Sequence, residues 1–218
     1  MTLDVKICGL KTREALDAAI TRGASHVGFV HFEKSPRHLT LASMAELAEI
    51  ARGRAEIVVV TVDPDDHLVE AIRSQIRPDW LQLHGKESAE RVVAIKQASG
   101  LKAMKALAVS TYDDLLPVET YRPVADALLL DSKRPKGSVL PGGNGLAFDW
   151  QILAALDPAI GFMLSGGLNA ENVSDALRIA RPAGLDVSSG VESAPGIKDI
   201  GRIHAFFDAL DRSIERAA

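Results

Sequence analysis

Short apolar runs recur eight times along the chain, and each is followed by a stretch whose apolar residues are spaced three or four apart. The runs are residues 5–8, 26–30, 57–62, 80–84, 102–107, 127–131, 162–165 and 185–188. This alternation is typical of parallel strands connected by helices. Eight such units in one chain leave about 27 residues per unit, which suffices for a closed (β/α)₈ barrel. We therefore predict an α/β fold, a single TIM barrel over residues 1–218, with a doubly wound open sheet as the alternative.

Several local signals mark where helices begin and end. Residues 169–180 show helical spacing, and Asn169 is expected to cap their first turn. Gly23, Gly100 and Gly184 are expected to close helices in the left-handed conformation. The longest irregular stretch, residues 132–147, follows the sixth run and is interpreted as an active-site loop.

Composition excludes several classes of function. The formal charge of −4 gives no basic footprint for nucleic acid. No charge-free stretch is long enough to span a bilayer, and the charged residues in positions 1–6 favour a cytoplasmic protein over a secreted one. Cys8 is the only cysteine, which excludes an internal disulfide, and the six histidines show no metal-binding spacing. We expect no metal site.

In a barrel of this kind, the active site lies where the strands end. Four single side chains stand at such positions, Cys8, Arg37, His84 and Asp131. Cys8 is either a buried space-filling residue or a reactive thiol, and Lys6 either lowers the pKa of that thiol or pairs with Asp186.

The other three side chains also have two interpretations each. Asp131 is either a loop cap or a general acid. Arg37 is either a solvated charge or a bidentate ligand for a carboxylate. His84 is either a hydrogen-bonding residue at the end of the barrel or part of the catalytic site.

Glycine and serine residues gather after the seventh and eighth runs. Gly166 and Gly167 follow one run, and Ser188, Ser189 and Gly190 follow the next. Loops at these two places bind phosphate in many barrels, because glycine lets backbone amides approach an anion closely. Either glycine loop alone is equally consistent with a tight turn, but the two together predict a phosphate site.

The same residues, taken in order, resemble the phosphoribosylanthranilate isomerases of tryptophan biosynthesis over nearly the whole chain. The motifs are Lys6-Ile7-Cys8-Gly9-Leu10, Gly28-Phe29-Val30, Ser35-Pro36-Arg37, Gln82-Leu83-His84-Gly85, Asp131, Gly142-Gly143-Asn144-Gly145, Ser165-Gly166-Gly167-Leu168, Asp186-Val187-Ser188-Ser189-Gly190-Val191-Glu192 and Pro195-Gly196-Ile197-Lys198-Asp199. The resemblance implies a barrel enzyme that performs an Amadori rearrangement of a phosphoribosyl substrate without a cofactor.

The resemblance also assigns roles to the candidate residues. It implies that Cys8 is the general base, that Asp131 is the general acid, and that Arg37 contacts the anthranilate carboxylate. His84 is expected among the substrate-binding residues. The phosphate contacts are expected from Gly166, Gly167, Ser188, Ser189 and Gly190. Such barrels are monomers or homodimers, and both states stay open here.

Two alternatives compete with this interpretation. The first is the similar Amadori isomerase of histidine biosynthesis, which carries an aspartate where this chain has Cys8. The second is a barrel that binds a phosphosugar without turning it over, against which the presence of both Cys8 and Asp131 argues.

Overall fold

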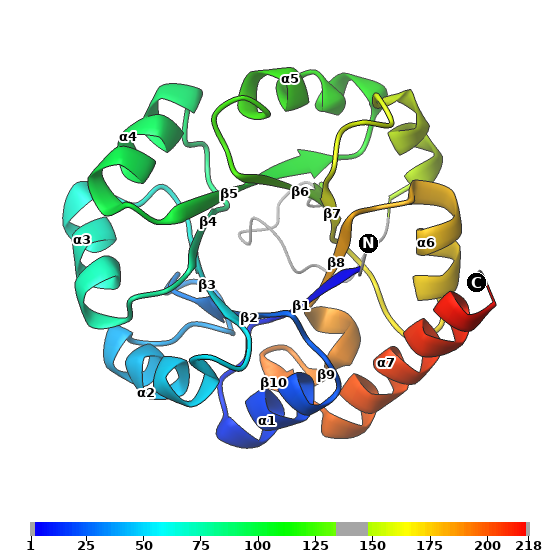
Figure 1. Ribbon diagram of the computed structural model, residues 1–218, viewed down its shortest axis with the longest axis horizontal. Coiled ribbons are helices and arrows are strands. Elements are labelled where there is room, and N and C mark those ends of the chain that lie inside the picture. Colours follow the sequence, from blue (N-terminus) through cyan, green and yellow to red (C-terminus); the bar gives the residue numbers. More distant parts are fainter. Residues whose placement is uncertain (1–2, 134–147, 217–218) are drawn as a thin grey trace.

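The computed structural model describes residues 3–133 and 148–216. Eight parallel strands close into a barrel in the order β1-β2-β3-β4-β5-β6-β7-β8 (Figure 1). This order confirms the predicted α/β TIM barrel and rules out the doubly wound open sheet. The strands are β1 (Asp4–Cys8), β2 (His26–Val30), β3 (Glu56–Thr61), β4 (Trp80–Leu83), β5 (Lys102–Val109), β6 (Ala127–Ser132), β7 (Met163–Leu164) and β8 (Gly184–Val187).

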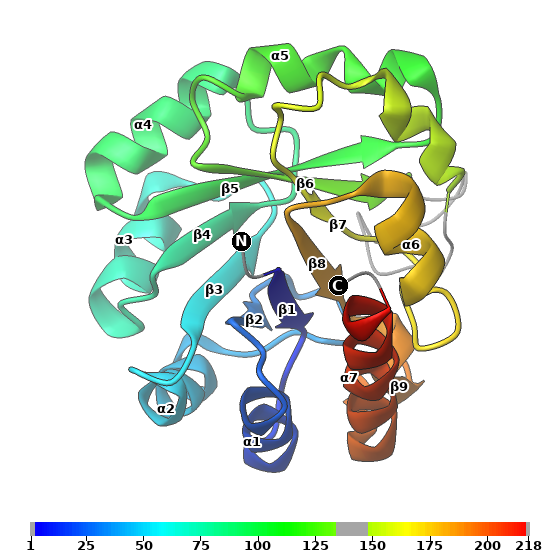
Figure 2. The ribbon, with the colours of Figure 1, turned by 45° about the vertical axis from the view of Figure 1, so that its right-hand side comes forward.

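Helices surround the barrel and cover the outward faces of the strands (Figures 1 and 2). The α-helices are α1 (Arg13–Thr21), α2 (Leu41–Ala51), α3 (Asp66–Gln75), α4 (Ala89–Ser99), α5 (Pro117–Tyr121), α6 (Val173–Ala180) and α7 (Ile200–Glu215). Short 3₁₀ helices are η1 (Tyr112–Leu115), η2 (Trp150–Ala155) and η3 (Ser189–Val191). A small antiparallel hairpin, β9 (Glu192–Ala194) and β10 (Ile197–Lys198), follows η3.

The first four helices begin with side chains that the sequence is well suited to supply. Thr12, Thr40, Asp65 and Ser88 each accept a hydrogen bond from a backbone N–H in the first turn. Such caps satisfy amides that have no partner within the helix, and each stabilises its helix by about 1 kcal/mol.

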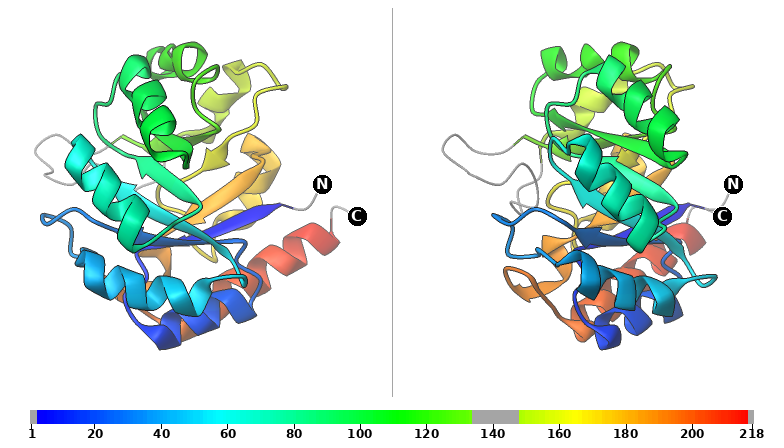
Figure 3. Two further views of the ribbon diagram at one scale, coloured as in Figure 1. Left: turned by 60° about the vertical axis from the view of Figure 1, so that its left-hand side comes forward. Right: turned by 90° about the vertical axis from the view of Figure 1, so that its left-hand side faces the viewer.

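The parallel order brings the carboxyl ends of all eight strands to one end of the barrel. Figure 3 shows that β1 begins and α7 ends at the opposite end. Inside the barrel, Met104, Ala106, Leu129 and Met163 form a buried apolar layer. The strand ends above this layer therefore form the floor and walls of a pocket rather than the mouth of a pore.

The structure corrects two expectations about helix ends. Helix α6 begins at Val173 and not at Asn169, because the Asn169 side chain accepts hydrogen bonds from the amides of Glu171 and Asn172 and so closes a separate turn. Gly184 lies within β8, and Arg181, with φ of +46°, closes α6 instead. Gly100 and Gly23 have positive φ at helix ends, as predicted.

Strand β2 has the predicted bounds, and the bounds of the other strands differ from the predicted ones by one or two residues. Strand β7 is shortened most relative to its predicted length, because it contains only Met163–Leu164 instead of residues 162–165. Ser132 belongs to β6, and most of the predicted active-site loop, 134–147, lies outside the described residues. Among the described helices, none is both long and apolar enough to cross a bilayer.

Candidate active site

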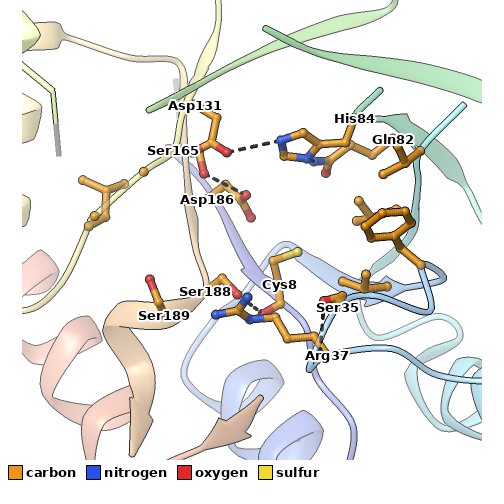
Figure 4. A pocket seen from close by; sticks show the side chains of 17 residues that line it. Cys8, Ser35, Arg37, Gln82, His84, Asp131, Ser165, Asp186, Ser188 and Ser189 are labelled. Atoms are coloured by element: carbon orange, nitrogen blue, oxygen red, sulfur yellow. Dashed lines mark hydrogen bonds and ion pairs between the residues drawn. The ribbon is translucent and has the colours of Figure 1, made fainter. Parts of the chain in front are cut away.

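A pocket opens at the carboxyl ends of the strands (Figure 4). It brings together eight of the nine residues predicted for the site: Cys8, Arg37, His84, Asp131, Gly166, Gly167, Ser188 and Ser189. Gly190 is the exception, because it lines a neighbouring cavity that shares Gly167 and Ser189 with the first. The side chains at the strand ends therefore converge on one pocket, as predicted.

Asp131 stands on one wall, at the end of β6, and is 2% exposed. Its Oδ2 lies 3.2 Å from Nε2 of His84, and Nδ1 of His84 lies 3.1 Å from Nε2 of Gln82. With the Gln82 amide nitrogen facing Nδ1, the proton of a neutral His84 is on Nε2 and is donated to Asp131. Oδ1 of Asp131 is buried and has no hydrogen-bond partner among the described residues. One carboxyl oxygen is thus held by the protein, and the other is available to a ligand.

Cys8 stands on a different wall, at the end of β1 (Figure 4). In the register of β1 and β2, Cys8 lies opposite Gly28. A Cβ atom at Gly28 would lie 3.1 Å from the sulfur of Cys8 and 3.1 Å from Cε of Lys6. The glycine therefore leaves room for both side chains, which explains why β2 carries no larger residue at this point.

A buried ion pair lies beside the thiol. Nζ of Lys6 donates to Oδ1 of Asp186 over 2.8 Å, and the Ser165 hydroxyl donates to Oδ2. Burial alone would lower the pKa of Lys6, but Asp186 and Cys8 outweigh burial and raise it. Lys6 is therefore an ammonium group near neutral pH. Of the two roles considered for Lys6, the structure shows the pairing with Asp186 together with contact to Cys8.

The protonation of Cys8 reflects competing influences. Burial raises the pKa of the thiol above its ordinary value, and Lys6 opposes this effect with both its charge and a hydrogen bond. The Asp186 carboxylate raises the pKa further, and Lys198 lowers it. The thiol is the main form near neutral pH, and the two ammonium groups determine how much thiolate is present.

Arg37 lies at the edge of the pocket and is 5% exposed. Its Nε and Nη2 donate to the two carboxylate oxygens of Glu192 over 2.7 and 2.8 Å. Burial alone would raise the pKa of Glu192, but Arg37 and Lys198 outweigh burial and lower it, so the group is a carboxylate. Arg37 is thus a buried, oriented guanidinium rather than a solvated charge, and one bidentate partner comes from the protein itself.

The two glycine loops lie very close to their surroundings. Gly166 has φ of +90°, and a Cβ atom there would lie 2.5 Å from Ser132. A Cβ atom at Gly190 would lie 1.8 Å from the backbone oxygen of Leu168, which belongs to the other loop. Both positions require glycine for close packing, Gly166 against the end of β6 and Gly190 against the other loop, which is the structural alternative considered for them. They also keep the backbone of the two loops together at the edge of the pocket.

Comparison with known proteins gives a consistent result. The family model for N-(5′-phosphoribosyl)anthranilate isomerase matches residues 5–209. The N-(5′-phosphoribosyl)anthranilate isomerase of Rhizobium johnstonii is 54% identical over 98% of this chain and 96% of its own length. The chain belongs to this family.

Solved structures of phosphoribosylanthranilate isomerases have the same fold. One, in complex with reduced 1-(o-carboxyphenylamino)-1-deoxyribulose 5-phosphate, has a TM-score of 0.84 and 30% identity, and the match covers 97% of this chain and 100% of that one. Another, of monomers made from the dimeric Thermotoga maritima enzyme, has a TM-score of 0.84 and 31% identity with the same coverage. The family assignment disfavours the histidine-pathway isomerase considered as an alternative.

Within this isomerase fold, sequence reasoning missed part of the site. It did not predict that Glu192 and Lys198 contact Arg37 and Ser188, because these contacts depend on how the chain returns after β8. It also missed an apolar wall formed by Val30, Phe32, Val60 and Val62. Alternation along β2 and β3 was the available signal for Val30 and Val60.

Among the described residues, no group of three His, Cys, Asp or Glu side chains is arranged to hold a metal. The expected absence of a metal stays a prediction.

Proposed function

We propose that Cys8 is the general base and Asp131 the general acid of the reaction catalysed in this pocket. The reaction is the one that defines the family, the aldose–ketose isomerisation of N-(5′-phosphoribosyl)anthranilate to 1-(2-carboxyphenylamino)-1-deoxyribulose 5-phosphate in tryptophan biosynthesis. The observation that carries the proposal concerns two groups that face one pocket from different walls. One is a carboxyl oxygen that has no hydrogen-bond partner among residues 3–133 and 148–216, and the other is a thiol beside two ammonium groups.

The acid acts first. Protonated Asp131 gives its proton from Oδ1 to the ring oxygen of the ribose, and the bond between that oxygen and C1 breaks. The nitrogen lone pair forms the second C1–N bond, which gives an iminium ion. His84 holds Oδ2 of Asp131, so that Oδ1 is directed toward the pocket. His84 would then act on the substrate mainly by positioning the acid.

The base acts second. The positive iminium nitrogen makes the proton at C2 acidic, and the Cys8 thiolate removes it to give an enolamine. Protonation at C1 and loss of the proton from the C2 hydroxyl convert the enolamine to the ketone. Lys6 and Lys198 favour the thiolate that this step needs. No step requires a hydride carrier.

The two ends of the substrate carry negative charges that match different parts of the pocket. Arg37 is suited to the anthranilate carboxylate, since a guanidinium carries five N–H donors, and Glu192 accepts from the Nε and Nη2 side of the group. The phosphate would bind the backbone around Gly166, Gly167, Ser188, Ser189 and Gly190, where glycine lets backbone amides approach an anion closely. The apolar wall formed by Val30, Phe32, Val60 and Val62 would contact the aromatic ring.

Replacing Arg37 with alanine tests the carboxylate contact. We expect Arg37→Ala to raise KM by about 30- to 150-fold, which corresponds to about 2–3 kcal/mol for a buried charged hydrogen-bonding group. Steady-state kinetics measure the change. Because the variant also leaves Glu192 with one cation fewer, Arg37→Lys serves as a second variant that keeps the charge and loses the planar fork. Unchanged kinetics in folded Arg37→Ala would remove Arg37 from the binding site.

Replacing Gly190 with alanine tests the phosphate loops. The added methyl group meets the Leu168 oxygen and must push the loops apart, at a cost of about 1–3 kcal/mol. We expect KM to rise by about 5- to 150-fold. Gly161→Ala is the matched control, because its Cβ atom would lie at an ordinary 3.7 Å from Ala183. Equal kinetics for the two variants would argue against phosphate binding at these loops.

The decay of phosphoribosylanthranilate fluorescence on addition of the purified protein tests the activity directly. A chelator in the buffer tests independence from metal in the same experiment. Rapid loss of fluorescence is the expected result. Absence of decay with folded protein, together with turnover of the histidine-pathway substrate, would contradict the proposed function.

Other predictions concern the molecule as a whole. The partner is a small phosphoribosyl substrate, with neither nucleic acid nor membrane expected. The Thermotoga maritima relative is described as dimeric, and a monomer or homodimer stays the prediction for this chain. A cytoplasmic location and the organisation of residues 1–218 as one domain also stay predictions.

A further inference from the structure

Lys198 lies in β10, outside the barrel sheet, yet its side chain is 2% exposed. Its Nζ donates three hydrogen bonds, to the Ser188 backbone oxygen over 2.9 Å, to the Ser188 hydroxyl over 3.2 Å and to Oε1 of Glu192 over 2.7 Å. Three acceptors require three N–H groups, which only the ammonium form of lysine has. Burial lowers the pKa of Lys198 more than Glu192 and Cys8 raise it, but this geometry is that of the charged form.

The contacts of Lys198 continue to the base. The Ser188 hydroxyl accepts from Lys198 and donates to the backbone oxygen of Cys8 over 3.0 Å (Figure 4). Lys198 thus fixes the residue that joins the end of β8 to the end of β1. Removing the ammonium group would take one hydrogen bond from the Ser188 hydroxyl and one from the Ser188 backbone oxygen, which also accepts from the amide of Val191.

The groups that act on the thiol come from three elements. Lys6 belongs to β1 itself, Asp186 to β8 and Lys198 to β10. The attraction of Lys6 is partly offset by Asp186, which lies against it and repels a thiolate. Lys198 is therefore a second, separately held source of positive charge for the base.

We propose that Lys198 is a positioning residue for the general base, which holds the Cys8 end of β1 through Ser188 and stabilises the Cys8 thiolate by its charge. The proposal rests on the assignment of Cys8 as the base. Lys198, which lies outside the barrel sheet, would then support the residue that removes the C2 proton.

Thiol alkylation offers a test that does not depend on turnover. Cys8 is the only cysteine, so all iodoacetamide labelling detected by mass spectrometry reports on this one group. We expect Lys198→Met to raise the pKa of the Cys8 thiol by about one unit, so that alkylation at a fixed pH below that pKa slows by about tenfold. Lys198→Arg keeps the positive charge and is expected to alkylate much as the wild type does.

Lys105→Met is the matched control for this labelling experiment. Lys105 is also a buried lysine, paired with Glu87 over 2.7 Å, but it lies on β5 and is not among the groups that act on Cys8. If the two methionine variants change the alkylation pH profile equally, general loosening explains the effect and the proposal is overturned. An unchanged profile in Lys198→Met, with the fold intact by circular dichroism, overturns it as well.

The pH dependence of kcat separates this proposal from the role of Cys8. If the thiolate is the base, kcat rises with pH as Cys8 loses its proton, and Lys198→Met shifts this rise to higher pH by the same amount as the alkylation profile. Parallel shifts support both ideas. A shifted alkylation profile with an unshifted kcat profile supports the coupling of Lys198 to the thiol and overturns Cys8 as the base.

Discussion

Asp131→Asn is expected to lower kcat by at least about 10²-fold, the usual contribution of a positioned general acid. The asparagine side chain has nearly the same shape and keeps an oxygen toward His84, but it has no acidic O–H to give to the ribose ring oxygen. Without that proton the ring opens slowly, and every later step depends on the opened ring. The measurement is single-turnover decay of substrate fluorescence.

A binding control separates lost chemistry from lost structure. Reduced 1-(o-carboxyphenylamino)-1-deoxyribulose 5-phosphate, the ligand of a related isomerase structure, is a product analogue that needs no ring opening. Asp131→Asn should bind it within a few-fold of the wild-type affinity, since charge at the acid contributes little to holding an already open chain. Near-normal kcat in the variant would exclude Asp131 as the acid.

Asp131 could be recognised as a site residue in the sequence for a simple geometric reason. Asp131 ends an apolar run, and in a parallel barrel the ends of such runs meet at one mouth. The same argument located Cys8 and His84. What the sequence lacked was the distance across the barrel, so the hydrogen bond between His84 and Asp131 was not predictable.

The base side of the pocket was harder to predict, because its support comes from outside the strands. Glu192 and Lys198 belong to a hairpin whose register brings them side by side. The hairpin returns over the loop of Arg37, where a Cβ atom at Gly196 would lie 2.3 Å from the Pro36 oxygen. Such contacts depend on tertiary folding and leave no periodic trace in the sequence. A local pattern therefore finds Arg37 but not its partners.

The misplaced helix ends have a related cause. Asn169 has the residue type of a helix cap, and its side chain does accept two amides, but these belong to a turn that precedes α6. Gly184 has the residue type of a helix end, yet β8 needs it, because a Cβ atom there would lie 3.0 Å from Asp4 of β1. Asn169 thus caps a local turn instead of the helix, whereas at Gly184 close packing between neighbouring strands outweighs the local preference.

Cys8→Ala is expected to lower kcat by at least about 10²-fold while the protein stays folded. Alanine removes the sulfur that accepts the C2 proton and leaves Lys6, Lys198 and their carboxylates unchanged. The substrate should still bind and its ring should still open, since Asp131 is intact. The measurement is again fluorescence decay, beside thermal unfolding of both proteins. Turnover of Cys8→Ala close to that of the wild type would remove the base assignment.

Two further substitutions at Cys8 distinguish base chemistry from packing. Cys8→Ser has nearly the shape of cysteine, but its hydroxyl hardly ionises near neutral pH, so we expect it to be about as slow as Cys8→Ala. Cys8→Asp supplies a carboxylate between Lys6 and Lys198, which can accept a proton although it is a weaker base than a thiolate. It should be faster than Cys8→Ala and slower than the wild type, and its kcat should rise at lower pH, because a carboxyl ionises at lower pH than a thiol. If serine restored activity and aspartate did not, Cys8 would matter for its shape alone.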